Sequence, residues 1–186
     1  MIAIGANEQL PWYLARGSGI IALALLVASL VWGVLLATRV LRPHDRPAWL
    51  LDLHRWLGGM AVVMTGLHLV GLWLDGYVHF GLPELLLPGA SSYRPLAVAL
   101  GVVGMYLLLA VELTSLMRRR ISGRTWRAVH AVSYAATWLA VVHGALAGTD
   151  AGATGYRVLA VGLTVVSVAA GLVRVLRPRR RSVAVA

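Results

Sequence analysis

The sequence contains no cysteine, and this absence excludes several kinds of site. Disulfides, iron–sulfur clusters and thiolate metal sites all require cysteine, so histidine is the main soft ligand that remains. Charged residues are also scarce, at 13% of the chain, whereas 59% of the residues are hydrophobic and the mean hydropathy is +0.78. Such values exclude an ordinary soluble domain and predict a membrane protein.

Five long apolar segments account for this composition. About 20 apolar residues cross a bilayer as a helix, and no segment shows the alternating pattern of a β-barrel strand. We therefore predict an all-α integral membrane protein, with five transmembrane helices forming a bundle at about residues 17–38, 49–74, 95–117, 127–149 and 157–176. Residues 17–176 would form one transmembrane domain, preceded by an outer segment at 1–16 and followed by a basic inner tail at 177–186. The first span is too long for a signal-peptide core and lacks a basic region before it, so we expect no cleaved signal.

The excess of basic over acidic residues follows the predicted topology. A net charge of +10 could indicate nucleic-acid binding, but the arginines cluster between spans and in the tail, so we expect a lipid bilayer and no nucleic acid as partner. The basic clusters occupy residues 39–46, 118–127 and 174–181. All three fall on one side if the N-terminus is outside and the C-terminus is cytoplasmic, as in a multi-pass protein of the inner (plasma) membrane.

Four of the six histidines lie inside predicted spans. His44 and His79 fall in loops, where we expect solvated side chains. An ionisable side chain within a membrane is costly and commonly marks a functional site. A structural hydrogen bond could explain one such residue, but it explains four less well: His54, His68, His130 and His143.

The spacing of these histidines predicts two levels. His54 and His68 are 14 positions apart in the second span, and His130 and His143 are 13 apart in the fourth. These steps correspond to about 21 and 20 Å along parallel helices. Two imidazoles per level suit a six-coordinate b-type heme, as in a cytochrome b, whereas zinc needs about four protein ligands. A histidine-based metal or proton transporter without heme, or a structural role, remains the alternative.

The 13-residue step does not fit a straight helix. At about 100° per residue, 13 residues fall about 140° short of four turns, whereas 14 residues fall only about 40° short. Either the fourth span is bent or overwound between His130 and His143, or two hemes approach it from different sides.

The chain resembles the ferric-reductase-like transmembrane domain family. That family includes ferric reductases, NADPH oxidase membrane domains and the heme-binding membrane subunit of the bacterial methionine sulfoxide reductase system. The resemblance covers most of residues 11–176 and rests on PWYLARGSGIIAL, HRWLGGMAVVMTGLH, ELTSLMRRRIS and TWRAVHAVSYAATWLAVVH.

The resemblance implies a heme-binding bundle with two b hemes. His54 and His130 would hold the inner heme iron, and His68 and His143 the outer heme iron. It also implies electron transport from the inner to the outer side, as in the membrane component of an oxidoreductase. No flavin or nicotinamide domain follows residue 176, so we expect a separate flavoprotein or quinol as donor. The acceptor would be ferric iron, oxygen or an outer redox partner.

Further residues are candidates for supporting roles. Cations near the membrane surfaces could bind heme propionates, although orientation or snorkelling explains them equally well. These candidates are Arg55 and Arg127 at the inner level, and Arg16 and Arg94 at the outer level. Glu112 is expected to be neutralised by the arginines at 118–120, with a proton relay as the alternative.

The sequence also suggests roles for one tryptophan, four glycines and one loop. Trp126 is expected to anchor the membrane interface. Glycines that could admit a macrocycle are Gly58, Gly59, Gly66 and Gly144. The apolar loop at residues 75–94 is expected to be an ordered hydrophobic loop, and the alternatives are that it lies along the interface or caps the bundle.

Overall fold

A computed structural model describes residues 3–38, 48–148 and 152–176, and these residues are helical with short connections. The helices are α1 (Ala3–Thr38), α2 (Ala48–Leu74), α3 (Leu82–Leu86), α4 (Pro95–Leu116), α5 (Gly123–Ala131), α6 (Ser133–Ala147) and α7 (Thr154–Leu176). Five segments are long and apolar enough to cross a membrane: α1, α2, α4, α5 with α6, and α7. The predicted all-α membrane bundle is therefore confirmed.

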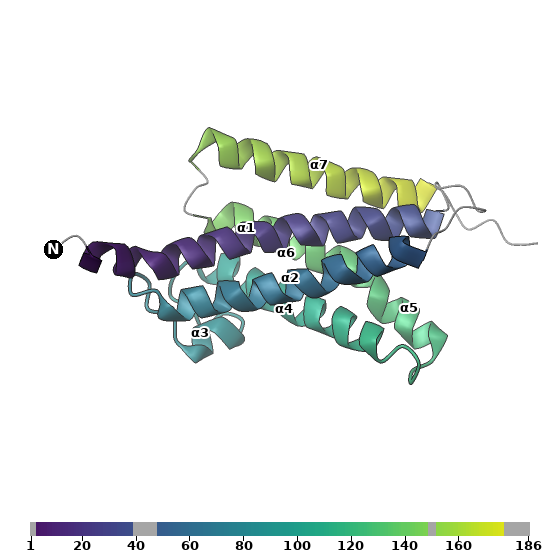
Figure 1. Ribbon diagram of the computed structural model, residues 1–186, viewed down its shortest axis with the longest axis horizontal. Helices are drawn as coiled ribbons and strands as arrows, with labels where there is room; N and C mark the ends of the chain where they lie inside the picture. The colour runs from purple at the N-terminus through teal and green to yellow at the C-terminus, as the bar shows by residue number, and fades with distance from the viewer. Residues whose placement is uncertain (1–2, 39–47, 149–151, 177–186) are drawn as a thin grey trace, which may run out of the picture.

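The helices form a bundle in which two pairs make the closest contacts. α1 packs along α2, and α4 packs along α6, while α7 lies against α1 and α6 at the edge (Figure 1). Gly71 of α2 is buried against α1 so tightly that a Cβ there would lie 2.5 Å from the Ala15 nitrogen. The small residues on these two helices therefore allow their backbones to approach closely.

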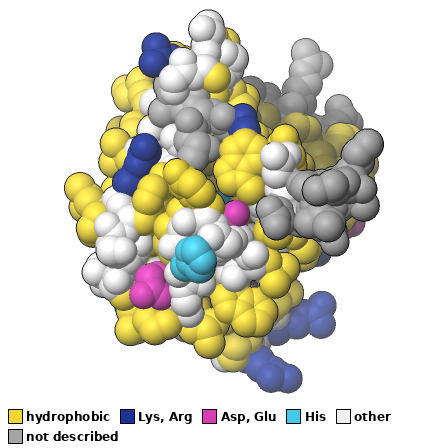
Figure 2. Space-filling model, turned by 90° about the vertical axis from the view of Figure 1, so that its left-hand side faces the viewer, with side chains coloured by type: hydrophobic (Ala, Val, Ile, Leu, Met, Phe, Trp, Pro, Cys, Tyr) yellow, Lys and Arg dark blue, Asp and Glu magenta, His cyan; other side chains and the backbone are white. Residues whose placement is uncertain are grey.

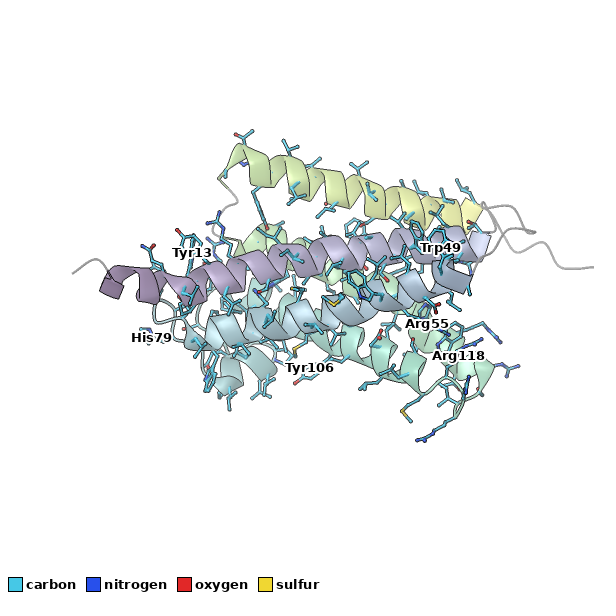
Figure 3. All side chains as sticks on the ribbon, in the orientation of Figure 1. Tyr13, Trp49, Arg55, His79, Tyr106 and Arg118 are labelled. Atoms are coloured by element: carbon cyan, nitrogen blue, oxygen red, sulfur yellow. The ribbon has the colours of Figure 1, made fainter. Side chains whose placement is uncertain are left out.

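Most of the described arginines gather at one end of the bundle, whereas Arg16, Arg94 and Arg157 lie toward the other. Arg55 and Arg118 lie at this arginine end together with Trp49, whereas Tyr13 and His79 lie at the opposite end (Figure 3). α1, α4 and α7 finish at the arginine end. His44 and the arginines of 39–46 and 177–181 lie outside the described residues.

The connection between α2 and α4 caps the end opposite the arginines. Phe80 and Leu85 are buried there and pack against Val98, Val102 and Met105 of α4. The connection is therefore an ordered hydrophobic loop packed on α4, as expected, and its position at this end agrees with a cap. Hydrophobic side chains cover much of the surface at this end, with few charged groups between them (Figure 2).

Two helix boundaries differ from those expected. α1 begins at Ala3, so most of the segment at 1–16 continues the first span as helix. The apolar pattern marks only the part within the membrane, and polar residues such as Glu8 and Gln9 propagate a helix well beyond it.

The fourth span is interrupted at Val132, between α5 and α6. The Val132 N–H donates to the Val129 carbonyl at 2.9 Å, three residues back, before the α-helical pattern resumes with Ala136 donating to Val132. A three-residue hydrogen bond tightens the helix locally, because it turns the chain further per residue. This interruption lies between His130 and His143, in the segment where the 13-residue step predicts a bent or overwound helix.

Candidate cofactor site: two pairs of facing histidines

The four intramembrane histidines form two pairs across the bundle. The rings of His54 (α2) and His130 (α5) have centroids 6.0 Å apart, and their planes meet at 77°. The rings of His68 (α2) and His143 (α6) have centroids 6.3 Å apart, and their planes meet at 79°. We call the first the inner pair, at the arginine end, and the second the outer pair.

Both rings of the outer pair are held by backbone hydrogen bonds. His68 Nδ1 donates to the Ala15 carbonyl of α1 at 2.6 Å, and His143 Nδ1 donates to the Ala97 carbonyl of α4 at 2.7 Å. A carbonyl oxygen can only accept, so each Nδ1 must carry the proton. Each Nε2 therefore keeps its lone pair for a ligand, and the ring orientation is fixed.

Glycines make these hydrogen bonds possible. A Cβ at Gly19 would lie 2.9 Å from His68 Nδ1, and a Cβ at Gly101 would lie 2.6 Å from His143 Nδ1. Gly19 lies four residues after Ala15, and Gly101 lies four residues after Ala97, so each glycine shares a helix face with its acceptor. The ring lies over the glycine while its nitrogen reaches the carbonyl one turn away.

The inner pair is held less firmly. His54 Nδ1 lies 3.3 Å from the Ser29 hydroxyl of α1, and a Cβ at Gly33 would lie 3.1 Å from His54 Cε1. A hydroxyl can donate or accept, so this contact leaves the His54 tautomer open. His130 Nδ1 is buried and has no hydrogen-bond partner among the described residues. Instead, the His130 ring stacks on Trp126, with centroids 4.9 Å apart and planes at 21°.

The residues of α1 that support the histidine rings are not among those predicted from the sequence, although their spacing carries a signal. On α1, Ala15 and Ser29 are 14 residues apart, as are Gly19 and Gly33, which matches the step from His54 to His68. Of the glycines expected near a macrocycle, Gly58 faces Glu112 and Gly144 faces Tyr156, whereas Gly59 and Gly66 have open space beside them. On α1, a small residue followed four positions later by a glycine occurs twice, and the two copies are 14 residues apart, like His54 and His68. This pattern identifies α1 as the helix that packs against the two histidines of α2.

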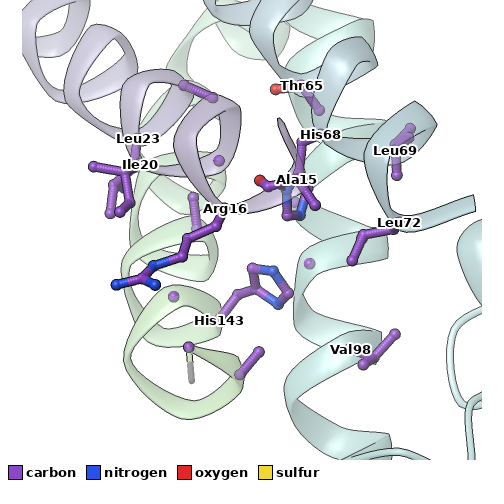
Figure 4. Close-up of a pocket in the computed structure, with 18 of the residues that line it drawn as sticks. Ala15, Arg16, Ile20, Leu23, Thr65, His68, Leu69, Leu72, Val98 and His143 are labelled. Carbon is purple, nitrogen blue, oxygen red and sulfur yellow. Dashed lines mark hydrogen bonds between the residues drawn. The ribbon is translucent and has the colours of Figure 1, made fainter. Parts of the chain in front are cut away.

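A cavity of about 270 Å³ surrounds the outer pair. Its lining is mainly apolar and includes Leu72 and Val98 near His68 and His143 (Figure 4). α7 supplies one wall of this cavity through Leu159, Ala160 and Leu163.

Two of the four candidate arginines lie at the outer level. Arg16 lines the cavity and lies over the Trp12 ring, with 4.6 Å from its guanidinium carbon to the ring centroid. Arg94 donates to the Leu146 carbonyl near the end of α6, so it supports that helix end.

The two inner arginines are exposed. Arg55 pairs with Asp52 at 3.2 Å on the surface, and the Arg127 side chain lies outside the bundle. Neither placement brings a guanidinium into the space between the inner imidazoles.

Glu112 packs against α2 near the inner pair. Its Oε2 lies 3.1 Å from the position that a Cβ on Gly58 would occupy. Within the described part of the chain, no arginine forms an ion pair with Glu112, so the expected neutralisation by residues 118–120 is not what the structure shows there.

The separation of the paired rings fits two imidazoles on opposite sides of one heme iron. A metal–imidazole nitrogen bond is about 2.1 Å and a ring nitrogen lies about 1.1 Å from its centroid, so two axial imidazoles have centroids about 6.4 Å apart. The observed 6.0 and 6.3 Å agree with this separation. No group of three or more histidine, cysteine or acidic side chains that could hold an ion occurs among the described residues, so each level offers two ligands. This donor set fits heme, which brings four nitrogens of its own.

Comparison with known proteins gives one match. A family model described as "Ferric reductase like transmembrane component" matches residues 18–146, a range that contains all four paired histidines but not α7. No curated protein and no solved structure matches the chain.

Proposed function

The chain belongs to the ferric-reductase-like transmembrane family, and from this premise we propose that it carries electrons across a membrane through two b-type hemes. Membership indicates transmembrane electron transfer in general. The finer proposal assigns one heme to His54 and His130 and a second to His68 and His143.

One observation carries the proposal, namely the separation and angle of the two ring pairs. Both levels have nearly the same centroid distance and nearly perpendicular rings, although His130 and His143 lie on different helices and the supporting contacts differ. Edge-to-face packing of aromatic rings also allows such distances, but it does not call for a costly ionisable imidazole at all four positions inside a membrane. A shared requirement to ligate one iron from opposite sides would produce it.

The side chains of this chain would bind, orient and enclose the cofactors. The outer imidazoles are presented with Nε2 free, because Ala15 and Ala97 accept from Nδ1. The apolar cavity around the outer pair keeps water away, and Arg16 at its lining could pair with a propionate. Each heme, when bound, supplies a one-electron carrier.

The direction of transfer is proposed from the charge distribution. We place the arginine end in the cytoplasm and the N-terminus outside the inner (plasma) membrane. Residues 17–176 would act as one membrane domain of an oxidoreductase. A separate flavoprotein or quinol would deliver electrons at the inner pair, and ferric iron, oxygen or a redox partner would receive them outside.

A histidine-based metal or proton transporter is supported less well. A metal site would need more ligands at one level than the two that each level offers among the described residues, and a proton carrier gives no reason for two facing imidazoles at each level.

The test is heme content in the full chain. We expect a reduced-minus-oxidised b-type spectrum and two hemes per chain, falling to one in His54→Ala and one in His68→Ala. His79→Ala, which removes an exposed loop histidine, is the matched control and should keep both. A folded, heme-supplied protein without b-type bands would overturn the proposal, and unchanged heme content in His68→Ala would overturn the outer assignment.

A further inference from the structure

His130 is supported differently from the other three paired histidines. His68 and His143 donate to carbonyls, and His54 contacts a hydroxyl, but His130 Nδ1 has no partner among the described residues. A ligand histidine normally uses its second nitrogen to fix its ring orientation. Some other contact must therefore set the plane of the His130 ring.

That contact is Trp126. The indole and imidazole planes meet at only 21°, and the two ring centroids are 4.9 Å apart. Trp126 precedes His130 by four residues on α5, so the two side chains share one face of the helix. The Ser122 hydroxyl starts this helix by accepting from the Thr125 N–H at 3.1 Å, which fixes the first turn that carries Trp126.

The tryptophan is itself held in place. The guanidinium carbon of Arg118 lies 4.5 Å from the centroid of the Trp126 ring, as in a cation–π contact. The indole Nε1 is buried and has no hydrogen-bond partner among the described residues. An interfacial anchor would instead direct this N–H toward the headgroups, so the anchoring role expected from the sequence does not explain the orientation.

We propose that Trp126 is the positioning residue for His130, and that stacking on its indole replaces the hydrogen bond that orients the other ligand rings. This inference rests on the proposed function, because it concerns an axial ligand. Trp126 acts only through His130 and keeps the ring nearly perpendicular to His54, as the 77° interplanar angle requires.

The test uses electron paramagnetic resonance of the oxidised, heme-loaded protein. Perpendicular axial imidazole planes give a low-spin ferric signal with one large g value, whereas planes closer to parallel give a rhombic signal. His54→Ala identifies which signal belongs to the inner level by removing it. The test variant is Trp126→Leu, which keeps an apolar side chain but removes the planar ring. The conservative variant is Trp126→Phe, which keeps a planar ring that can stack on His130.

A matched control is Trp138→Leu on α6, because Trp138 lies on the same span with its side chain 44% exposed. We expect Trp126→Leu to broaden the inner signal or shift it toward rhombic, with the outer signal unchanged. Trp126→Phe should restore the inner signal, and Trp138→Leu should leave both signals unchanged. Selective loss of the inner heme in Trp126→Leu, with retention in Trp126→Phe, would also support positioning.

Three results would overturn the inference while the proposed function stands. One is a Trp126→Leu protein with both hemes and both signals unchanged. The second is equal loss of both signals, which would make Trp126 a residue of general stability. The third is an inner signal that Trp126→Phe fails to restore. A wild-type protein that binds no heme would instead overturn the proposed function itself.

Discussion

The outer pair is held by backbone, whereas the inner pair is held by side chains. At the outer level both Nδ1 atoms donate to helix carbonyls, and the rings lie over Gly19 and Gly101 inside an apolar cavity. At the inner level one ring contacts a hydroxyl at 3.3 Å and the other stacks on an indole. Carbonyls of a helix barely move, so the outer ligands are preorganised, while the inner ligands depend on side chains with rotational freedom.

This difference predicts which level loses its heme first when the helices are shifted out of register. An alanine inserted after Gly59 would rotate the two ends of α2 by about 100° relative to each other. We expect heme content to fall from two to one per chain, with loss at the inner level, because the outer pair keeps its carbonyl acceptors. Heme-to-protein ratios, with His54→Ala and His68→Ala spectra as references, would identify the lost level.

The matched insertion after Val132 should be tolerated. It lengthens the step from His130 to His143 to 14 residues. In a regular helix, two residues 14 positions apart point within about 40° of the same direction. Loss of both hemes in this variant, or outer loss after the Gly59 insertion, would contradict our ranking of the levels.

Glycine substitutions test the fit of the outer rings. Gly101→Ala places a Cβ 2.6 Å from His143 Nδ1, and Gly33→Ala places one 3.1 Å from His54 Cε1. Overpacking a tight site costs about 1–3 kcal/mol. We expect Gly101→Ala to weaken outer heme retention strongly and Gly33→Ala to weaken inner retention less, as measured by heme transfer to apomyoglobin.

The control for these variants is Gly59→Ala. No atom lies within 4 Å of a Cβ there, so it gains helix propensity without a clash. Equal heme loss from Gly59→Ala and Gly101→Ala would remove the steric explanation.

Ser29→Ala tests the weakest of the three Nδ1 contacts. The hydroxyl lies 3.3 Å from His54 Nδ1, and a neutral hydrogen bond contributes about 0.5–1.5 kcal/mol. We expect a potentiometric titration to show a small change in the inner midpoint potential and none in the outer. A larger change at the outer centre would mean that the two levels are not supported separately.

The arginines should have the smallest effects. Arg16 lines the outer cavity, and removing its positive charge in Arg16→Gln should lower the outer potential by less than about 59 mV, the value of a tenfold change for one electron. Arg55→Gln should change neither centre, because Arg55 pairs with Asp52 at the surface. An Arg55→Gln shift that exceeds the Arg16→Gln shift would reverse the assignment.

The sequence predicts the membrane spans well because hydrophobic length alone decides them. It also locates the four histidines in two spans, and their nearly equal steps predict two levels. The step of 13 residues could not place the interruption at Val132, since that depends on how α5 and α6 pack against their neighbours. Ala15 and Ala97 accept the histidine hydrogen bonds through their backbone carbonyls, so their apolar side chains give no indication of this role in the sequence. Likewise, Trp126 fits an interfacial anchor until its plane relative to His130 is known.

The wall that α7 contributes to the outer cavity has a consequence for the order of assembly. A chain is made from its N-terminus, so α1, α2, α4, α5 and α6, with all four paired histidines, are made before Leu159, Ala160 and Leu163 of α7. During that interval the outer cavity is open along the flank that α7 later covers. The unfinished protein would thus offer a lateral entrance to the proposed outer heme, and α7 would close it.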